Sequence, residues 1–454
     1  MWTATESRRG APPPAIGEQG LIRAIGRWAL TAAVINTVVG SGVFGLPAPL
    51  TSLAGQWSPV AVLLAGAGVF VVVLCFAEVG SRFDGAGGPY LYARETFGPA
   101  IGFQIGWLHI WTRLLSAAAV LNVLASYLTV LVPWTRTPVG RAAAITVAVT
   151  LVTIVNLRGV RHAAWTVNAF TVAKLVPLVG LVLLGTFHIQ SEVLATQGVV
   201  EPRWTEAILL LVFAFGGFES AVVAGSESRD PRRDTSFALM TAMISVTVLY
   251  FLVQFTIVGV LPNAAANPAP VSAALGILVG PPGITIGSVA VIVSVYGWLT
   301  GFALMTPRIP FAMAAHGELP RMVARVHAGT RVPDLAIVLN SLIALTLGLI
   351  SDFSQLATFA AISRLAIYAS TCGALVLLRR IRGPSEGFRA PGGPMLALSG
   401  VAFSLWLLST RSLAEAWFLP AILATGVLVW VATRRARHAA AETAAPSPLS
   451  AGAK

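Results

Sequence analysis

Apolar segments long enough to cross a membrane recur along nearly the whole chain, and they constrain the fold more than any other feature. A helix needs about 20 mostly apolar residues to cross about 30 Å of hydrocarbon. Such segments are predicted near 28–52, 59–79, 99–132, 142–157, 164–187, 205–225, 237–261, 283–312, 333–350, 355–378, 395–410 and 416–433. Hydrophobic residues make up 56% of the sequence and charged residues only 11%, which excludes an ordinary soluble domain. We expect an all-α polytopic membrane protein of about twelve transmembrane helices.

Arginines lie in alternate loops between these segments and predict the orientation of the chain. One set of loops and both chain ends hold most of them: Arg8, Arg9, Arg23, Arg27, Arg158, Arg161, Arg229, Arg232, Arg233, Arg321, Arg325, Arg331, Arg379, Arg380, Arg382, Arg389, Arg434, Arg435 and Arg437. The positive-inside rule then predicts a multi-pass protein of the cytoplasmic (inner) membrane with both termini cytoplasmic. The net charge of +12 is mostly a topology signal. The expected partner is the lipid bilayer, and nucleic acid is not expected because the arginines are spread over short loops.

The two ends of the chain and its cysteines carry further expectations. Residues 1–20 are polar and rich in proline and glycine, so we expect no cleavable signal peptide. Residues 1–27 are interpreted as a cytoplasmic N-terminal segment and 434–454 as a cytoplasmic disordered tail. Cys75 and Cys372 both lie in apolar segments, so no disulfide framework, metal cluster or cofactor is expected. The sequence carries no signal for an oligomeric state.

The first apolar segment contains residues that interrupt a helix. Two glycines flank a serine in Gly40-Ser41-Gly42, and Gly45 and Pro47 follow one turn later. Glycine and proline both weaken a helix interior. Non-helical backbone at membrane depth is tolerated only where it lines a cavity or is buried in protein. An interrupted helix in a many-span protein is therefore a pointer to the binding site of a secondary transporter.

A second interruption is predicted five spans later. The sixth apolar segment holds Gly216 and Gly217 near its middle, followed by Glu219. Inverted repeats place interrupted helices at matching positions of two halves. We therefore expect a 5+5 inverted repeat of 28–187 and 205–378, with the first and sixth helices broken and with 395–433 forming two extra helices. The alternative for each interruption is that small residues merely permit close helix packing.

Four motifs follow one another along the chain. They are Val39-Gly40-Ser41-Gly42-Val43-Phe44, then Phe76-Ala77-Glu78 with Gly87-Gly88-Pro89-Tyr90-Leu91-Tyr92, then Phe213-Ala214-Phe215-Gly216-Gly217-Phe218-Glu219, and finally Ala314-Ala315-His316-Gly317-Glu318-Leu319-Pro320. In this order they resemble the motifs of the amino acid–polyamine–organocation superfamily of transporters, over roughly 20–435. The resemblance implies a twelve-helix, five-plus-five fold with an amino acid site at mid-membrane.

An interrupted helix suits an α-amino acid, which brings a carboxylate and an ammonium group. Free N–H groups and a positive dipole end at the start of the second segment suit the carboxylate, and we assign Ser41, Gly42 and Val43 to it. Free carbonyls at the end of the first segment suit the ammonium. The residues assigned to the ammonium are Val38, Phe213, Ala214 and Gly216.

Two residues near the second interruption have further expected roles. In related transporters an aromatic residue at the position of Phe213 stacks over the substrate as a gate, and the alternative is one apolar residue among many in a span. Glu219 is a functional candidate because ionisable residues in spans are costly. Three roles stay open for it: contact with substrate, proton coupling, and a hydrogen bond to the unwound backbone.

Three basic residues also fall within spans. In related sodium-independent transporters a lysine of the fifth helix places its ammonium where sodium-coupled relatives hold an ion, and Lys174 matches it. The resemblance thus implies a sodium-independent carrier with Lys174 as ion surrogate and proton carrier. Arg113 and Arg364 are expected to pair with Glu78 or Glu219, although the sequence shows no partner for either.

The predicted function is a permease that moves amino acids across the membrane, driven by protons or by exchange. An enzyme is not expected, because the chain lacks a His-Glu-x-x-His motif and a nucleophile elbow. Transport of a polyamine or other organic cation and a transporter-like amino acid sensor stay open as alternatives. Glu219 is the one acidic candidate near the interruptions, which favours neutral or hydrophobic amino acids over charged ones.

Overall fold

The computed structural model describes residues 26–83, 88–158, 174–198, 201–219, 230–315, 317–325, 327, 332–385 and 387–444. Within these residues the chain forms helices and no strand. Seven helices are long and apolar enough to cross a membrane: Pro47–Gly80, Pro99–Leu131, Pro138–Leu157, Arg233–Val260, Pro281–Ala303, Phe353–Arg382 and Ala414–Arg434. The prediction of an all-α polytopic membrane protein is confirmed. The count of twelve spans and the inverted repeat stay predictions.

The longer helices begin and end close to the predicted apolar segments. Their bounds are α1 Arg27–Val38, α2 Gly42–Gly45, α3 Pro47–Ala54, α4 Ser58–Gly80, α5 Gly88–Phe97, α6 Pro99–Leu131, α7 Pro138–Leu157, α9 Ser191–Thr196, α10 Trp204–Ala214, α12 Pro231–Val260, α13 Pro270–Val279, α14 Pro281–Met305, α15 Arg308–Ala315, α16 Asp334–Ile350, α17 Phe353–Arg382, α18 Pro394–Ser409, α19 Leu413–Ala416 and α20 Phe418–Ala444. A further apolar helix spans Lys174–His188.

Proline explains where several of these helices start. Pro99, Pro138, Pro281 and Pro394 each occupy the first position of a helix. The missing N–H of proline is not needed there, and its fixed φ suits a helix start. The local sequence therefore sets these boundaries without help from packing.

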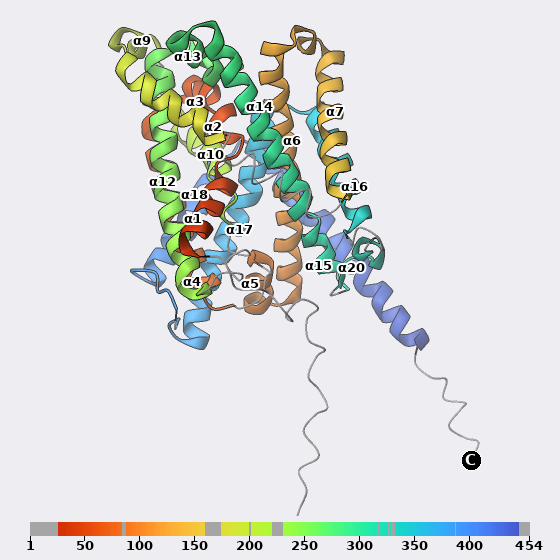
Figure 1. Ribbon diagram of the computed structural model, residues 1–454. Helices are drawn as coiled ribbons and strands as arrows, with labels where there is room; N and C mark the ends of the chain where they lie inside the picture. The colour runs from red at the N-terminus through yellow and green to blue at the C-terminus, as the bar shows by residue number, and fades with distance from the viewer. Residues whose placement is uncertain are drawn as a thin grey trace, which may run out of the picture.

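The helices stand side by side and enclose α17 and α6 (Figure 1). α17 packs against α6, α10 and α18, and α12 packs against α4 and α1. The short helices α9 and α13 lie at one end of the bundle, and α5 and α15 lie at the other end (Figure 1). This arrangement brings α1, α2 and α10 together beside α17, α12 and α14.

The outer helices expose apolar side chains, as expected for contact with lipid. Val139 and Val147 of α7 and Leu428 of α20 are mostly exposed. Large exposed apolar surfaces are unusual on soluble monomers and mark contact with another apolar phase. This exposure fits the transmembrane assignment of both helices.

The last helix is longer than predicted. α20 continues to Ala444, whereas the sequence predicts the end of the last span at 433 and a disordered tail from 434. Residues 434–444 are rich in alanine and arginine, which favour a helix. The first part of the expected tail is therefore helical. The N-terminal segment 1–25 and residues 445–454 lie outside the described residues.

Candidate functional site

The first interruption lies where the glycine and serine residues predict it. α1 ends at Val38, three non-helical residues follow, and α2 begins at Gly42. A Cβ on Gly40 would lie 3.1 Å from Nε1 of Trp298 on α14. A Cβ on Gly42 would lie 2.7 Å from Cα of Ala214 at the end of α10. Gly42 is thus required by a close backbone neighbour and brings the two interrupted helices into contact, whereas a side chain at Gly40 would have to displace the Trp298 ring slightly.

The second interruption follows α10. Its helix ends at Ala214, and Gly217 has a φ of +118°, a conformation that strongly favours glycine. A Cβ on Gly217 would lie 2.6 Å from the carbonyl oxygen of Thr37 on α1. The two interruptions therefore meet twice, at Gly42 with Ala214 and at Gly217 with Thr37.

Lys174 supplies a donor to the carbonyl end of α1. Its Nζ donates to the carbonyl oxygens of Asn36 and Val39, the latter at 2.8 Å, and the side chain is buried. The last carbonyls of a helix have no intrahelical partner. Lys174 supplies the partner here, so the structure places it at the first interruption.

Tyr250 of α12 connects the carbonyl ends of both interrupted helices. Its hydroxyl oxygen lies 3.0 Å from the carbonyl oxygen of Val38 and 3.2 Å from that of Ala214. A hydroxyl has one proton and donates to one of them at a time. Tyr250 is not among the residues that the sequence predicts for the site. Its signal is a hydroxyl within an otherwise apolar span, which needs a partner when buried.

Arg364 and Glu219 form a buried ion pair at the second interruption. Nε of Arg364 lies 3.1 Å from Oε1 of Glu219, and its Nη1 donates to the carbonyl oxygen of Phe213 at 3.1 Å. A Cβ on Gly216 would lie 2.0 Å from Cζ of Arg364, so glycine makes room for the guanidinium. The predicted partner of Arg364 is thus Glu219.

Glu219 also holds the unwound backbone. Its Oε2 accepts the N–H of Gly217 at 2.8 Å. Of the three roles left open for Glu219, this hydrogen bond is the one that the geometry contains. Direct contact with substrate and proton coupling stay untested.

Glu78, the other acidic residue considered for pairing, lies in a separate cluster. It accepts hydrogen bonds from Arg82, Arg379 and the N–H of Ala390, with 2.8 Å from Oε1 to Nε of Arg379 and 2.7 Å from Oε2 to Ala390 N. These contacts tie the end of α4 to α17 and to the chain before α18. Glu78 therefore pairs with neither Arg113 nor Arg364.

The groups expected to receive a carboxylate lie on the other side of the first interruption. Ser41 is buried, and its Oγ has no hydrogen-bond partner within the described part of the chain. Gly42 and Val43 follow as the first residues of α2, where helix N–H groups lack intrahelical partners. Ser41, Gly42 and Val43 thus offer unused polar groups, whereas the carbonyl ends are occupied by side chains.

The interruptions are closed on each other in this structure. A cavity of only about 10 Å³ lies between Gly42, Val43, Ala214, Tyr250, Gln254 and neighbouring apolar residues. This is about the space of one water molecule, far less than an amino acid needs. The ring of Phe213, the expected gate, packs edge-on against Phe353 with ring centres 5.9 Å apart.

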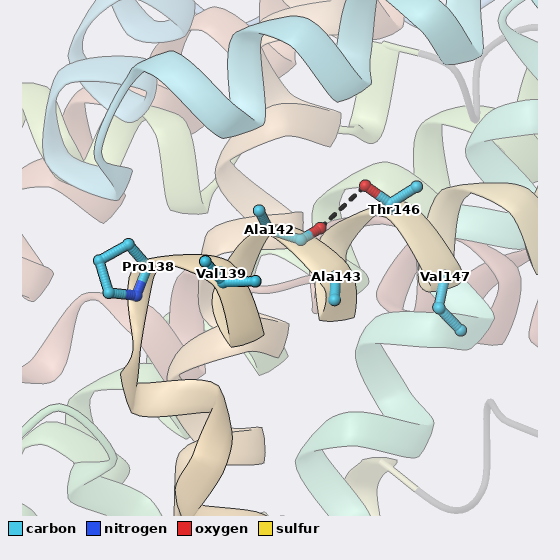
Figure 2. Close-up of a pocket in the computed structure, with 6 residues that line it drawn as sticks. All are labelled: Pro138, Val139, Ala142, Ala143, Thr146 and Val147. Atoms are coloured by element: carbon cyan, nitrogen blue, oxygen red, sulfur yellow. Dashed lines mark hydrogen bonds between the residues drawn. The ribbon is translucent and has the colours of Figure 1, made fainter.

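A larger hollow lies elsewhere. Figure 2 shows it along α7, lined by Pro138, Val139, Ala142, Ala143, Thr146 and Val147. All six residues belong to one helix and offer almost only apolar atoms. The hollow is part of the apolar outer surface and has none of the polar groups that an amino acid requires.

Together, an apolar helix bundle and two interrupted helices that share polar partners define a membrane carrier. The sequence matches the amino acid permease family over residues 25–433, and the chain belongs to this family. Its relatives are transporters and not enzymes.

Three relatives show the range within the family. The chain is 27% identical to the serine/threonine exchanger of Bacillus subtilis (strain 168), with 88% of this chain and 93% of the relative covered. It is 24% identical to the methylthioribose transporter of the same organism, with 91% and 92% covered. It is 30% identical to the putative arginine/ornithine antiporter of Escherichia coli (strain K12), with 90% and 92% covered.

Proposed function

We propose that this protein is a sodium-independent secondary transporter that moves amino acids across the cytoplasmic membrane, by proton coupling or by exchange. One observation carries the proposal. Gly42 and Ala214 bring the two interruptions into backbone contact, and the Tyr250 hydroxyl bonds to the carbonyl ends of both. A shared polar centre between interrupted helices is where carriers of this type bind substrate.

The proposed binding mode uses both ends of the interruptions. The substrate carboxylate binds Ser41 and the first N–H groups of α2, at Gly42 and Val43. The substrate ammonium binds carbonyls that side chains now occupy, and it displaces Tyr250 or part of Arg364 as donor. The occupied carbonyls are those of Val38 and Ala214, which Tyr250 contacts, and of Phe213, which Arg364 contacts; the carbonyl of Gly216 is the fourth proposed acceptor.

Lys174 supports the proposed independence from sodium. Its ammonium bonds to the carbonyl oxygens of Asn36 and Val39, which are hard oxygen ligands of the kind that a small cation prefers. A fixed ammonium removes the need for such an ion at this place. Release and uptake of its proton would couple transport to a proton gradient.

The proposed topology follows from the arginines. Both termini are assigned to the cytoplasm, because the arginine-rich ends of α17 and α20 and the start of α1 belong to the same set of loops. The proposed membrane is the cytoplasmic membrane.

The alternatives remain a polyamine or other organic cation transporter and a transporter-like sensor. The buried Arg364 between the interruptions disfavours a multiply charged cation, because like charges in a low dielectric repel strongly. The serine/threonine exchanger and the putative arginine/ornithine antiporter support an amino acid, while the methylthioribose transporter shows that the family alone does not define the substrate.

The test is uptake of radiolabelled amino acids and polyamines into proteoliposomes in sodium-free buffer, with and without an inward proton gradient. Saturable amino acid uptake, driven by the gradient or by internal amino acid, is the expected result. Binding without flux under any gradient or preloading would identify a sensor, and polyamine uptake alone would identify an organic cation carrier.

A further inference from the structure

Arg113 is a buried arginine that pairs with no carboxylate of the described residues. It lies on α6 and is 5% exposed. Its Nε lies 3.3 Å from Oγ1 of Thr306, and its guanidinium lies 5.3 Å and 5.7 Å from the ring centres of Trp298 and Phe302. In the described part of the chain no carboxylate lies within ion-pair distance of it. Cation–π contacts and one hydroxyl only partly replace the water that an arginine loses on burial.

Glu219 attracts Arg113 only through space, because both of its carboxylate oxygens have other direct partners. Its Oε1 pairs with Arg364 and its Oε2 accepts the N–H of Gly217. Around the two interruptions the described residues thus hold one carboxylate against the two arginines and Lys174. An excess of buried positive charge within a membrane is costly, and such residues mark substrate pathways.

Arg113 lies close to the first interruption through Trp298. The Trp298 indole lies under the guanidinium of Arg113 and against Gly40, with Nε1 3.1 Å from the place of a Cβ on that glycine. Arg113, which has no ion-pair partner among the described residues, therefore contacts the tryptophan that packs against Gly40. The residue after this glycine, Ser41, carries a buried hydroxyl with no hydrogen-bond partner in the same described part of the chain.

We propose that the site selects amino acids whose side chain carries a second carboxylate, and that Arg113 binds this side-chain carboxylate. The inference rests on the proposed transport of amino acids and specifies their class. The α-carboxylate is received by the start of α2, so Arg113 remains available for a further negative charge. An arginine–carboxylate pair in a desolvated site forms strong, charge-assisted hydrogen bonds. This departs from the neutral or hydrophobic substrates that the sequence favoured, because no carboxylate of the described residues pairs with Arg113.

The test compares acids with their amides in proteoliposomes. L-Glutamate and L-aspartate have nearly the same shape as L-glutamine and L-asparagine and differ in charge. We expect the wild type to prefer each acid over its amide by at least about tenfold in kcat/KM. Arg113→Gln should bring this ratio close to one while amide transport is retained. Arg203→Gln is the matched control, since Arg203 is 58% exposed at the far end of α10 and pairs with Glu206; it should keep the wild-type ratio.

Two results overturn the inference: amides transported as well as acids by the wild type, or an unchanged ratio in folded Arg113→Gln. If Arg113→Gln does not fold, two measurements still test the inference. They are the acid-to-amide ratio of the wild type and the same ratio for Arg113→Lys, which keeps the positive charge. Transport of neutral amino acids with exclusion of acids refutes this inference alone. No binding or transport of any amino acid refutes the proposed function itself.

Discussion

The free carbonyl groups at the two interruptions find their hydrogen-bond donors in different ways. At the first, the ammonium of Lys174 bonds to the carbonyl oxygens of Asn36 in α1 and of Val39 just after it, and no carboxylate of the described residues takes part. At the second, Arg364 bonds to the carbonyl of Phe213 and at the same time pairs with Glu219, which in turn holds Gly217. At the first interruption the Ser41 hydroxyl has no hydrogen-bond partner among the described residues, whereas at the second the Arg364–Glu219 pair provides partners for the unwound backbone.

This difference separates a binding role from a structural one. We propose that the unused polar groups at the first interruption, with Arg113 nearby, receive a ligand that brings negative charge. The ion pair at the second interruption keeps the backbone open without a ligand. We therefore expect changes at the first interruption to act mainly on transport, and changes at the second to act mainly on stability.

The largest effect is expected for Gly42→Val. The added side chain must push α2 away from Ala214, because a Cβ alone would lie 2.7 Å from its Cα. A shift of about 1 Å in such a site can lower the rate by about 100-fold. Uptake into proteoliposomes measures it. Gly180→Ala is the control, because no atom lies within 4 Å of the new Cβ. Transport at the wild-type level by Gly42→Val would contradict the site assignment.

The next largest effect is expected for Arg364→Ala. The change leaves Glu219 buried without its partner, which typically costs about 3–5 kcal/mol of folding free energy. Thermal unfolding in detergent measures the loss. Arg203→Ala breaks an exposed pair with Glu206, where about 0–1 kcal/mol is expected. The double variant Arg364→Met with Glu219→Leu should recover part of the stability. If Arg364→Ala and Arg203→Ala proved equally stable, the second interruption would not depend on its ion pair.

Lys174→Met extends the comparison of the two interruptions, because it changes the first one only. It removes a donor from two carbonyls but leaves no unpaired carboxylate, so the expected loss of stability is smaller, about 1–3 kcal/mol. Stimulation of uptake by a proton gradient should disappear, while exchange of internal for external amino acid continues. Gradient-driven and exchange uptake, measured side by side, provide the readout. An unchanged response to the gradient would remove Lys174 from proton coupling.

Tyr250→Phe removes the one hydroxyl that serves both interruptions. The loss of this hydrogen bond should cost about 0.5–1.5 kcal/mol. The substrate ammonium competes with Tyr250 for the same carbonyls, so removal of this competitor favours a higher substrate affinity. Any loss of binding free energy should therefore be smaller than the loss of folding free energy. Thermal unfolding with and without substrate measures both. A large loss of affinity at unchanged stability would make Tyr250 a direct substrate ligand.

The smallest effect is expected for Tyr90→Phe, far from either interruption. The Tyr90 hydroxyl donates to Glu318 at 2.7 Å, and burial together with this carboxylate raises the pKa of Tyr90. The hydrogen bond contributes about 1 kcal/mol to the folding free energy. Because the pKa of Tyr90 is raised in the folded protein, this contribution is constant below about pH 10 and falls as the pH rises further. The free energies of unfolding of the wild type and of Tyr90→Phe, measured as a function of pH, test this expectation. Altered substrate selectivity in this variant would contradict the placement of the site.

Local sequence predicts much of this molecule because helix propensity and apolar length act within one segment. The bounds of most helices, the interruption at Gly40-Ser41 and the turn at Gly216-Gly217 follow from residues that lie there. The resemblance to related carriers predicts that Lys174 takes the place of an ion, and this role stays a prediction. The structure adds that its ammonium bonds to the carbonyl oxygens of Asn36 and Val39.

The sequence by itself determined the apolar helices, the two glycine-rich interruptions and the ionisable residues that fall within the spans. Only the tertiary structure decided how those charges are distributed. Arg364 meets Glu219 across 145 residues of sequence, Tyr250 reaches both carbonyl ends, and Arg113 remains without a carboxylate in the described chain. Such pairings depend on the rotation and depth of each helix against its neighbours. Packing sets both, and no periodicity within a single segment contains them.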